Sequence, residues 1–340
     1  MSVQKLFGTA LQAHRTYIFS IQARGFKKHV SRTLMELNKR KENIEFGKTP
    51  NPPPPRSSYL EWNYDAELYS FGKRLGEHIE PSLLAQSLTQ RSFIIVEEEK
   101  QKSVGIEDPI LNVKENTPLV EEGKAFTSRY VKQYMRIALP FFPEEGIQSV
   151  HNYLLSEEVI ANIASHIGMN DIVQTAEYPI EASSLHSCFF ALVEAIRLSN
   201  DEHTAGNFVR DLVLTQLGGK NVNDLWELEN PEDKLNTIYR NHGEELPEPR
   251  LVGASAKNTI LANYQVAYYN KDKQMIGLGF GESVEIGKEM AARDALRRLF
   301  RTSERDAPIK YNLEINPAQQ KRVNPSLDEW NEKILLQATG

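Results

Sequence analysis

The residues that could carry covalent or metal chemistry are few in this chain of 340 residues. The single cysteine, Cys188, excludes an intrachain disulfide and a zinc site built from several cysteines. His186 lies two residues before it, and we interpret this pair as incidental, with Cys188 a small core residue. The eight histidines are scattered, and none forms a His-x-x-x-His pair with an acidic companion. We therefore expect no cofactor and no metal bound by cysteine or histidine.

Positive charge is concentrated at the amino terminus. Met1 to Glu42 contains nine basic and two acidic residues, a net of +7, whereas the whole chain has a net charge of −6. A basic arm on an acidic body is typical of a component of an assembly, because the arm can bind a polyanion while the body packs on other parts. The candidate phosphate contacts on the arm are Arg32, Lys39, Arg40 and Lys41.

The first acidic residue is Glu36, and the residues before it are rich in Arg, Lys, Ser and Thr with interspersed apolar positions. This composition predicts a mitochondrial transit peptide at residues 1–25, removed near Arg24-Gly25-Phe26. The alternative is a basic tail that stays attached. Residues 26–62 then read as a basic helical arm and a stiff proline-rich spacer. No stretch has the uninterrupted apolar length of a membrane helix.

Residues 63–226 give helical patterns throughout. Pro81 and Pro118 each stand at the start of a predicted helix, and Ser156 is a predicted cap. Residues 229–303 change pattern: a helix with Asn230 as its cap and Pro231 at its first position, three short strands, and a last helix capped by Ser283. The expected strands are 250–254, 263–269 and 275–280, with both helices on one face of the sheet. Residues 304–340 are left as a C-terminal tail.

The second module resembles the double-stranded-RNA-binding domain in its element order and in two stretches, Gly279-Phe-Gly-Glu-Ser283 and Lys288-Glu-Met-Ala-Ala-Arg-Asp-Ala-Leu296. The resemblance implies recognition of an A-form duplex by shape and phosphates. It places cations at Lys257, in the first inter-strand loop, and at Lys288. The family usually has three lysines at the start of the last helix, so we expect weakened binding to free duplex.

The helical part resembles the ribonuclease III fold. The stretches that carry the resemblance are Leu83-Leu-Ala-Gln-Ser-Leu-Thr-Gln-Arg-Ser92 and Asn116-Thr-Pro-Leu-Val-Glu-Glu-Gly-Lys124. The expected fold is therefore an all-α ribonuclease III-like domain followed by an α+β (α-β-β-β-α) double-stranded-RNA-binding-like domain. With the transit-like arm and the segment 208–220, the chain is most similar to the ribonuclease III-like proteins of the mitochondrial large ribosomal subunit.

Ribonuclease III chemistry needs clustered carboxylates, because Mg²⁺ must be held by oxygen ligands beside the scissile phosphate. Active ribonuclease III enzymes carry five acids on two helices. By the resemblance, the corresponding positions in this chain hold Thr117, Val120, Lys124, Ser187 and Phe190. Glu121 and Glu122 lie farther round the first helix, and Glu194 lies one turn beyond Phe190 on the second. We interpret these three as solvated surface carboxylates. The nuclease site is therefore expected to be inactive.

Three hypotheses follow. The first is a non-catalytic structural protein of the mitochondrial large ribosomal subunit, in the matrix, whose partners are the large-subunit ribosomal RNA and other large-subunit proteins. The second is a mitochondrial endoribonuclease that processes double-stranded RNA with unrecognised acids. The third is a soluble duplex-RNA-binding regulator outside the ribosome. Since ribonuclease III domains typically dimerise through helical faces, a ribonuclease III-like dimer partner is also expected.

Overall fold

The computed structural model describes residues 32, 34–43, 55–59, 61–106, 111, 113–257, 259–303, 309–313, 315 and 323–331. The chain divides into two compact units, residues 1–60 and 61–340. In the first unit, residues 34–43 are helical and Arg56–Ser58 form the short 3₁₀ helix η1. The expected transit peptide at 1–25 and the prolines 52–54 of the spacer lie outside the described residues.

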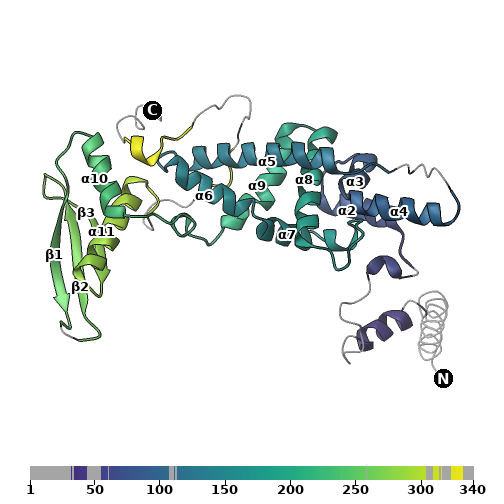
Figure 1. The fold of residues 1–340 in the computed structure, drawn as a ribbon, viewed down its shortest axis with the longest axis horizontal. Helices are drawn as coiled ribbons and strands as arrows, with labels where there is room; N and C mark the ends of the chain where they lie inside the picture. The colour runs from purple at the N-terminus through teal and green to yellow at the C-terminus, as the bar shows by residue number, and fades with distance from the viewer. Residues whose placement is uncertain are drawn as a thin grey trace, which may run out of the picture. The chain divides into compact units, whose positions relative to one another are not determined.

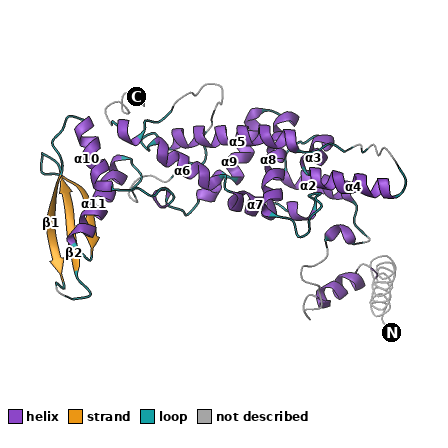
Figure 2. Cartoon of the chain, in the orientation of Figure 1, coloured by secondary structure: helices purple, strands orange, loops and turns teal. Residues whose placement is uncertain are grey.

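The second unit begins with helices alone, as the sequence predicts (Figures 1 and 2). Caps fit the local chemistry, since Asn63, Ser156 and Asp201 each accept a backbone N–H of the first turn through a side-chain oxygen. The α-helices are α2 (Tyr64–Leu75), α3 (Pro81–Ser87), α4 (Arg91–Ser103), α5 (Thr117–Ala138), α6 (Glu144–Leu154), α7 (Glu157–His166), α8 (Ala182–Ser199) and α9 (Glu202–Leu212).

Helix α8 forms the centre of this helical domain. Its residues from Cys188 to Ile196 are all buried, because other helices, α5, α7, α3 and α9 among them, pack round it. The 3₁₀ helices η2 (Met169–Asp171), η3 (Leu214–Leu217) and η4 (Val222–Asp224) complete the domain and lead into the next one. No helix among the described residues combines the length and the apolar character needed to cross a membrane.

The second domain has the predicted order of helix, three strands and helix. Its elements are α10 (Pro231–Asn241), β1 (Glu248–Ser255), β2 (Asn263–Tyr269), β3 (Met275–Gly281) and α11 (Val284–Leu299). The strands form one antiparallel sheet in the order β1-β2-β3. Helix α11 packs on β3 and β2, and α10 packs on α11. Ser283 caps α11 as predicted, with its Oγ 3.2 Å from the Ile286 N.

Asn230 precedes Pro231 at the start of α10, but the predicted side-chain cap is wrong. Asn230 has a left-handed backbone (φ 47°) and its side chain makes no capping hydrogen bond. Asparagine tolerates this conformation better than most residues, so its role here is to turn the chain into the helix.

The described end of the chain packs on both domains. Residues 323–331, which include the 3₁₀ helix η5 (Leu327–Glu329), lie against the end of α5, the start of α6 and α10. The Asn324 side-chain amide donates to the Leu139 and Phe142 carbonyl oxygens at 3.0 and 2.8 Å. The Trp330 indole is fully buried and donates to the Phe141 carbonyl oxygen at 2.8 Å.

Candidate functional site

The two helices that would carry a ribonuclease III metal centre, α5 and α8, cross in direct backbone contact at Gly123. A Cβ atom at this position would overlap the Phe190 carbonyl oxygen, so only glycine permits the approach. The crossing brings the two expected halves of the site onto neighbouring helices. The family-positioned residues are Thr117, Val120 and Lys124 on α5, and Ser187 and Phe190 on α8.

None of these five side chains offers a carboxylate. Thr117 and Lys124 are exposed, Val120 is half-buried, and Phe190 is fully buried among core aromatic residues. The Ser187 hydroxyl donates to the Ser183 carbonyl oxygen of its own helix at 2.9 Å. In the part of the chain that the structure describes, no three His, Cys, Asp or Glu side chains lie together in a group that could hold a metal ion. A lysine at the crossing would instead repel a divalent cation.

Glu194 differs from its expected state. Its side chain is only 2% exposed, so the expectation of a solvated surface carboxylate is wrong. The Arg197 guanidinium donates to both Glu194 carboxylate oxygens, at 2.7 and 2.8 Å. This bidentate pair holds the pKa of Arg197 above its usual range through the hydrogen bond to Glu194. The sequence signal that could have indicated a paired, buried acid is the apolar stretch from Cys188 to Ile196, which only Glu194 interrupts, with an arginine three residues after that acid.

Glu121 and Glu122 are exposed on α5, as expected. Arg197 also reaches the Glu202 carboxylate at 3.4 Å, and Arg129 reaches the same carboxylate at 3.4 Å. The acids nearest the crossing are thus either solvated or matched by arginines. They do not form an unpaired group that could take the place of the missing metal ligands.

Cys188 and His186 do not act as a pair. Cys188 is buried, its Sγ accepts from the Asn116 side-chain amide at 3.4 Å, and burial raises the pKa of its thiol to about 12. The His186 Nε2 donates to the Leu155 carbonyl oxygen at 3.2 Å, and its ring lies edge-on to Phe190. A neutral buried thiol is a poor nucleophile, so Cys188 is a core residue, as the sequence predicts.

The cations expected to contact RNA fall into two groups, one in each of the two units. Arg32, Lys39, Arg40 and Lys41 belong to the first unit. The Arg40 guanidinium lies over the Tyr59 ring, 3.9 Å from its centroid, so one arm cation already has an aromatic partner.

Lys257 and Lys288 belong to the α-β-β-β-α domain. Lys257 is exposed in the loop between β1 and β2. Lys288 is half-buried in the second turn of α11, one turn beyond the Ser283 cap. Because Gly281 at the end of β3 pairs with Tyr264 at the start of β2, the loop and the start of α11 lie at the same end of the sheet.

Two family models match the chain. Residues 63–196 match the model described as "Large ribosomal subunit protein mL44, endonuclease domain", and residues 226–331 match the model described as "MRPL44 dsRNA-binding domain". The chain belongs to the mL44 family. A curated relative, the large ribosomal subunit protein mL44 of Caenorhabditis elegans, is 34% identical over 250 residues. The match covers 72% of this chain and 62% of the relative, so the chain spans about three fifths of that protein.

Two solved structures were also matched. The nuclease domain of ribonuclease III from Campylobacter jejuni aligns with a TM-score of 0.36 at 18% identity, over 43% of this chain and 95% of that domain. Dicer from Pichia stipitis aligns with a TM-score of 0.30 at 15% identity, over 53% of this chain and 85% of that one.

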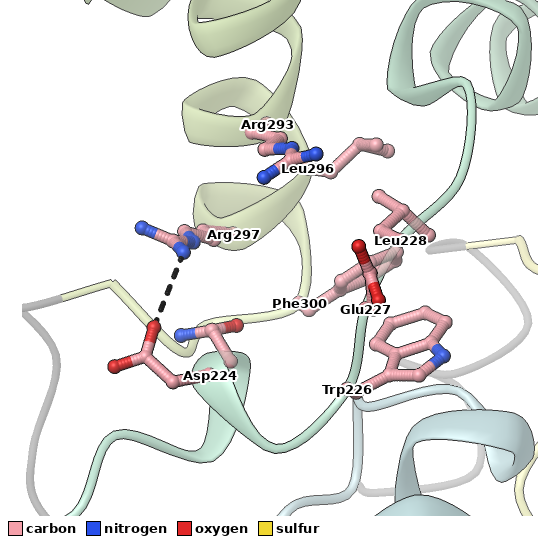
Figure 3. Close-up of a pocket in the computed structure, with 9 residues that line it drawn as sticks. Asp224, Trp226, Glu227, Leu228, Arg293, Leu296, Arg297 and Phe300 are labelled. Atoms are coloured by element: carbon pink, nitrogen blue, oxygen red, sulfur yellow. Dashed lines mark ion pairs between the residues drawn. The ribbon is translucent and has the colours of Figure 1, made fainter.

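The mL44 dsRNA-binding model extends to residue 331 and so includes the packed C-terminal segment. Where this domain meets the preceding connection, the described residues surround a cavity of about 310 Å³ (Figure 3). Its two arginines are already engaged, Arg297 with Asp224 at 3.8 Å and Arg293 with Glu289 at 2.9 Å. The apolar wall consists of Trp226, Leu228, Leu296 and Phe300. The cavity lies where the connection at 222–228 meets α11.

Proposed function

We propose that the chain is a structural, non-catalytic component of the mitochondrial large ribosomal subunit, in the mitochondrial matrix. It packs on the ribosomal RNA and on neighbouring subunit proteins and supports mitochondrial translation. The names of the family models and of the relative support the ribosomal part of this proposal. The observation that carries the non-catalytic part is the α5–α8 crossing, where the five family-positioned acids are replaced by Thr117, Val120, Lys124, Ser187 and Phe190.

The electrostatics of the crossing support this assignment. Metal-assisted hydrolysis requires several carboxylates that converge on one or two Mg²⁺ ions. Lys124 brings a positive charge to that place, and the carboxylate of Glu194 is neutralised by Arg197. A divalent ion would have to displace a bidentate arginine from a buried acid, which is strongly unfavourable.

The proposed RNA contacts are electrostatic. Cations on an arm can order along a phosphate backbone during assembly and release counterions, which supplies most of the affinity for a polyanion. In the helical stretch 34–43, Lys39 and Lys41 are exposed and Arg40 is half-buried, as is Lys288 in α11. We assign the contacts to Arg32, Lys39, Arg40, Lys41, Lys257 and Lys288, with the arm residues dominant.

A ribonuclease III-like partner chain is part of the proposal. Helix α4 has no buried residue, although it carries the apolar run Phe93 to Val96, of which Ile95 is exposed. A helix of a related fold would cover this face. Cross-linking from position 95 in isolated large subunits tests this point, and we expect a product with a ribonuclease III-like chain. A cross-link to RNA alone, with none to a protein, contradicts it.

Sedimentation of a tagged full-length chain from mitochondrial lysate tests the ribosomal role. We expect the chain to migrate with the large subunit under conditions that keep ribosomes intact. Migration in light, RNA-free fractions would contradict the proposal, and salt-sensitive binding to free duplex RNA in those fractions would favour a regulator outside the ribosome.

A nuclease assay tests the absence of catalysis. We expect purified chain with labelled duplex RNA and Mg²⁺ to give no cleavage above the protein-free control. Cleavage that disappears in Glu122→Gln or Glu194→Gln would identify a processing nuclease and overturn the non-catalytic assignment. Cleavage that survives both substitutions indicates a contaminating nuclease.

The arm and the compact domain can be compared directly. We expect reversal of Arg32, Lys39, Arg40 and Lys41 to Glu to reduce the fraction of chain that co-sediments with the large subunit by about tenfold or more, since several phosphate contacts are lost together. Lys288→Glu should have a smaller effect. The measurement is quantitative immunoblotting of gradient fractions, with variants matched for import and folding. If Lys288→Glu fails to assemble while the arm variant assembles normally, the compact domain carries the contact.

A further inference from the structure

The loop between β1 and β2 holds two neighbouring aliphatic side chains in solvent. Ile260 is 99% exposed and Leu261 is 77% exposed. Among the described residues, no other large hydrophobic side chain is as exposed as Ile260. Single exposed aliphatic residues are common on proteins, but an adjacent pair this exposed at a loop tip is typical of a surface that is buried in an assembly.

Hydrogen bonds within the loop hold the tip in place. The Thr259 hydroxyl donates to the Ala256 carbonyl oxygen at 2.7 Å and accepts from the Leu261 N at 3.2 Å. The Ala262 N donates to the Thr259 carbonyl oxygen at 3.0 Å, and Ser255 pairs with Asn263 at the base of the loop. A partner would therefore meet a tip that is already ordered, which lowers the entropic cost of binding.

Exposed apolar side chains and charges of both signs surround the tip. At the same end of the sheet, Phe280 of β3 is 53% exposed, and Ile286 of α11 is also exposed. Glu282 and Glu285 stand exposed beside them. The basic residues at this end are Lys257 in the loop and the half-buried Lys288 of α11.

We propose that Ile260 and Leu261 form a protein-docking anchor that inserts into an apolar pocket with a basic rim on a neighbouring protein. The proposal rests on the chain being a ribosomal-subunit component and names the kind of partner that this end of the domain contacts. Aliphatic side chains gain free energy when they leave water for an apolar pocket, and gain little against phosphates. Glu282 and Glu285 would attract lysines or arginines on the rim of such a pocket.

Site-specific photo-cross-linking tests the class of partner. The photoreactive amino acid p-benzoylphenylalanine replaces Ile260 in the full-length chain, and cross-linking is carried out on purified large subunits. We expect a ribonuclease-resistant cross-link to one subunit protein, mapped by mass spectrometry to an apolar peptide flanked by basic residues. A cross-link to RNA, or none from chain that is incorporated, overturns the docking proposal. Absence of the chain from the subunit contradicts the ribosomal role instead.

Substitutions test the energetic role of the tip. Ile260→Asp with Leu261→Asp should lower the incorporated fraction at least tenfold. Val104→Asp is the matched control, since Val104 is also a highly exposed aliphatic residue but lies at the end of α4. Because Lys257 is also assigned an RNA contact, Lys257→Glu should lower incorporation, but less than the double aspartate variant does. If Lys257→Glu impairs incorporation and the double aspartate variant does not, the loop contacts phosphate and the docking proposal is wrong.

Discussion

Gly123 is the residue that lets α5 and α8 meet backbone to backbone. An added Cβ would overlap the Phe190 carbonyl oxygen and lie 3.3 Å from the Glu194 Cβ. We expect Gly123→Ala to lower the free energy of unfolding by about 1–3 kcal/mol, because the two central helices must move apart. Urea unfolding followed by circular dichroism measures this change.

Gly72→Ala in α2 is the control for that substitution. Its added Cβ would be 3.6 Å from Leu84 Cδ2, an ordinary contact, and alanine favours a helix interior by about 0.5–1 kcal/mol over glycine. Gly72→Ala should therefore be neutral or stabilising. Equal effects of the two substitutions would show that the backbone approach at Gly123 is not a tight constraint.

His151 and His186 make the helical domain sensitive to acid. Burial lowers the pKa of both imidazoles below the usual 6.5, and Lys132 and Lys124 respectively lower it further. Hydrogen bonds to Asn152 and to the Leu155 carbonyl, and the charge of Glu157 near His186, act in the opposite direction. The unfolded chain therefore binds protons at a higher pH than the folded chain does. Stability is complete above about pH 6.5 and falls as the pH drops from there towards the lowered folded pKa values.

Replacement of both histidines tests this linkage. We expect the free energy of unfolding of the wild type to fall between about pH 7.5 and about pH 5.5, and the His151→Gln, His186→Gln variant to lose less over the same range. Urea unfolding at each pH gives the comparison, with His203→Gln as the control because His203 is exposed. An unchanged slope in the double variant would assign the acid sensitivity to other groups.

At the level of single residues, the sequence predicts which positions lack catalytic acids but not how the remaining acids are used. The residues Thr117, Lys124 and Phe190, which stand where the resemblance to ribonuclease III places acids, can be read from the chain. The burial of Glu194 could not, because it depends on several helices packing round α8 and on Arg197 closing over the carboxylate. Exposure statistics for glutamate therefore gave the wrong expectation.

At the level of elements, small residues set the distance between β3 and α11. A Cβ on Gly279 would overlap the backbone nitrogen of Ala291, and one on Gly277 would overlap the Ala291 carbonyl oxygen. The strand alternates glycine on the side that faces the helix, and Gly287, Ala291 and Ala295 recur every four residues on α11. The order of the elements along the chain and their approximate limits were predictable from hydrophobic periodicity and turn residues. The close packing was not, because it depends on how the strand and the helix meet in space.

Gly279→Ala should separate these two elements. We expect a loss of about 1–3 kcal/mol from overpacking and a weaker hydrogen bond between the Leu278 N and the Asp294 carboxylate, which are 2.8 Å apart. Hydrogen exchange of the β3 amides measures the effect. Gly253→Ala on β1 is the comparison, since its added Cβ meets the movable Gln265 side chain at 3.3 Å. Equal protection of β3 in both variants would contradict the close-packing account.

At the level of the whole second unit, the described end of the chain joins the two domains. Trp330 lies edge-on to Phe300 of the RNA-binding-like domain, while its indole donates to Phe141 of the helical domain. Lys234 of α10 pairs with Asp328 at 3.1 Å, and the Leu327 N donates to the Glu145 carboxylate. Nothing in the hydrophobic periodicity or composition of residues 304–340 indicated these contacts, because they are made by single side chains in and around one short 3₁₀ helix.

Trp330→Ala should uncouple the two domains. Removal of a fully buried tryptophan costs about 3–5 kcal/mol, and here it also leaves the Phe141 carbonyl without its indole donor. We expect the single unfolding transition of the wild type to split, with the α-β-β-β-α domain unfolding at a lower urea concentration than the helical domain. In a Trp62→Phe background, the fluorescence of Trp226 and far-ultraviolet circular dichroism should then give different midpoints. Val323→Ala, at an exposed position of the same segment, is the control and should keep coincident transitions. If Trp330→Ala unfolds in one transition at the wild-type midpoint, the segment only covers the surface, and other contacts such as that of Phe142 with Phe300 join the domains.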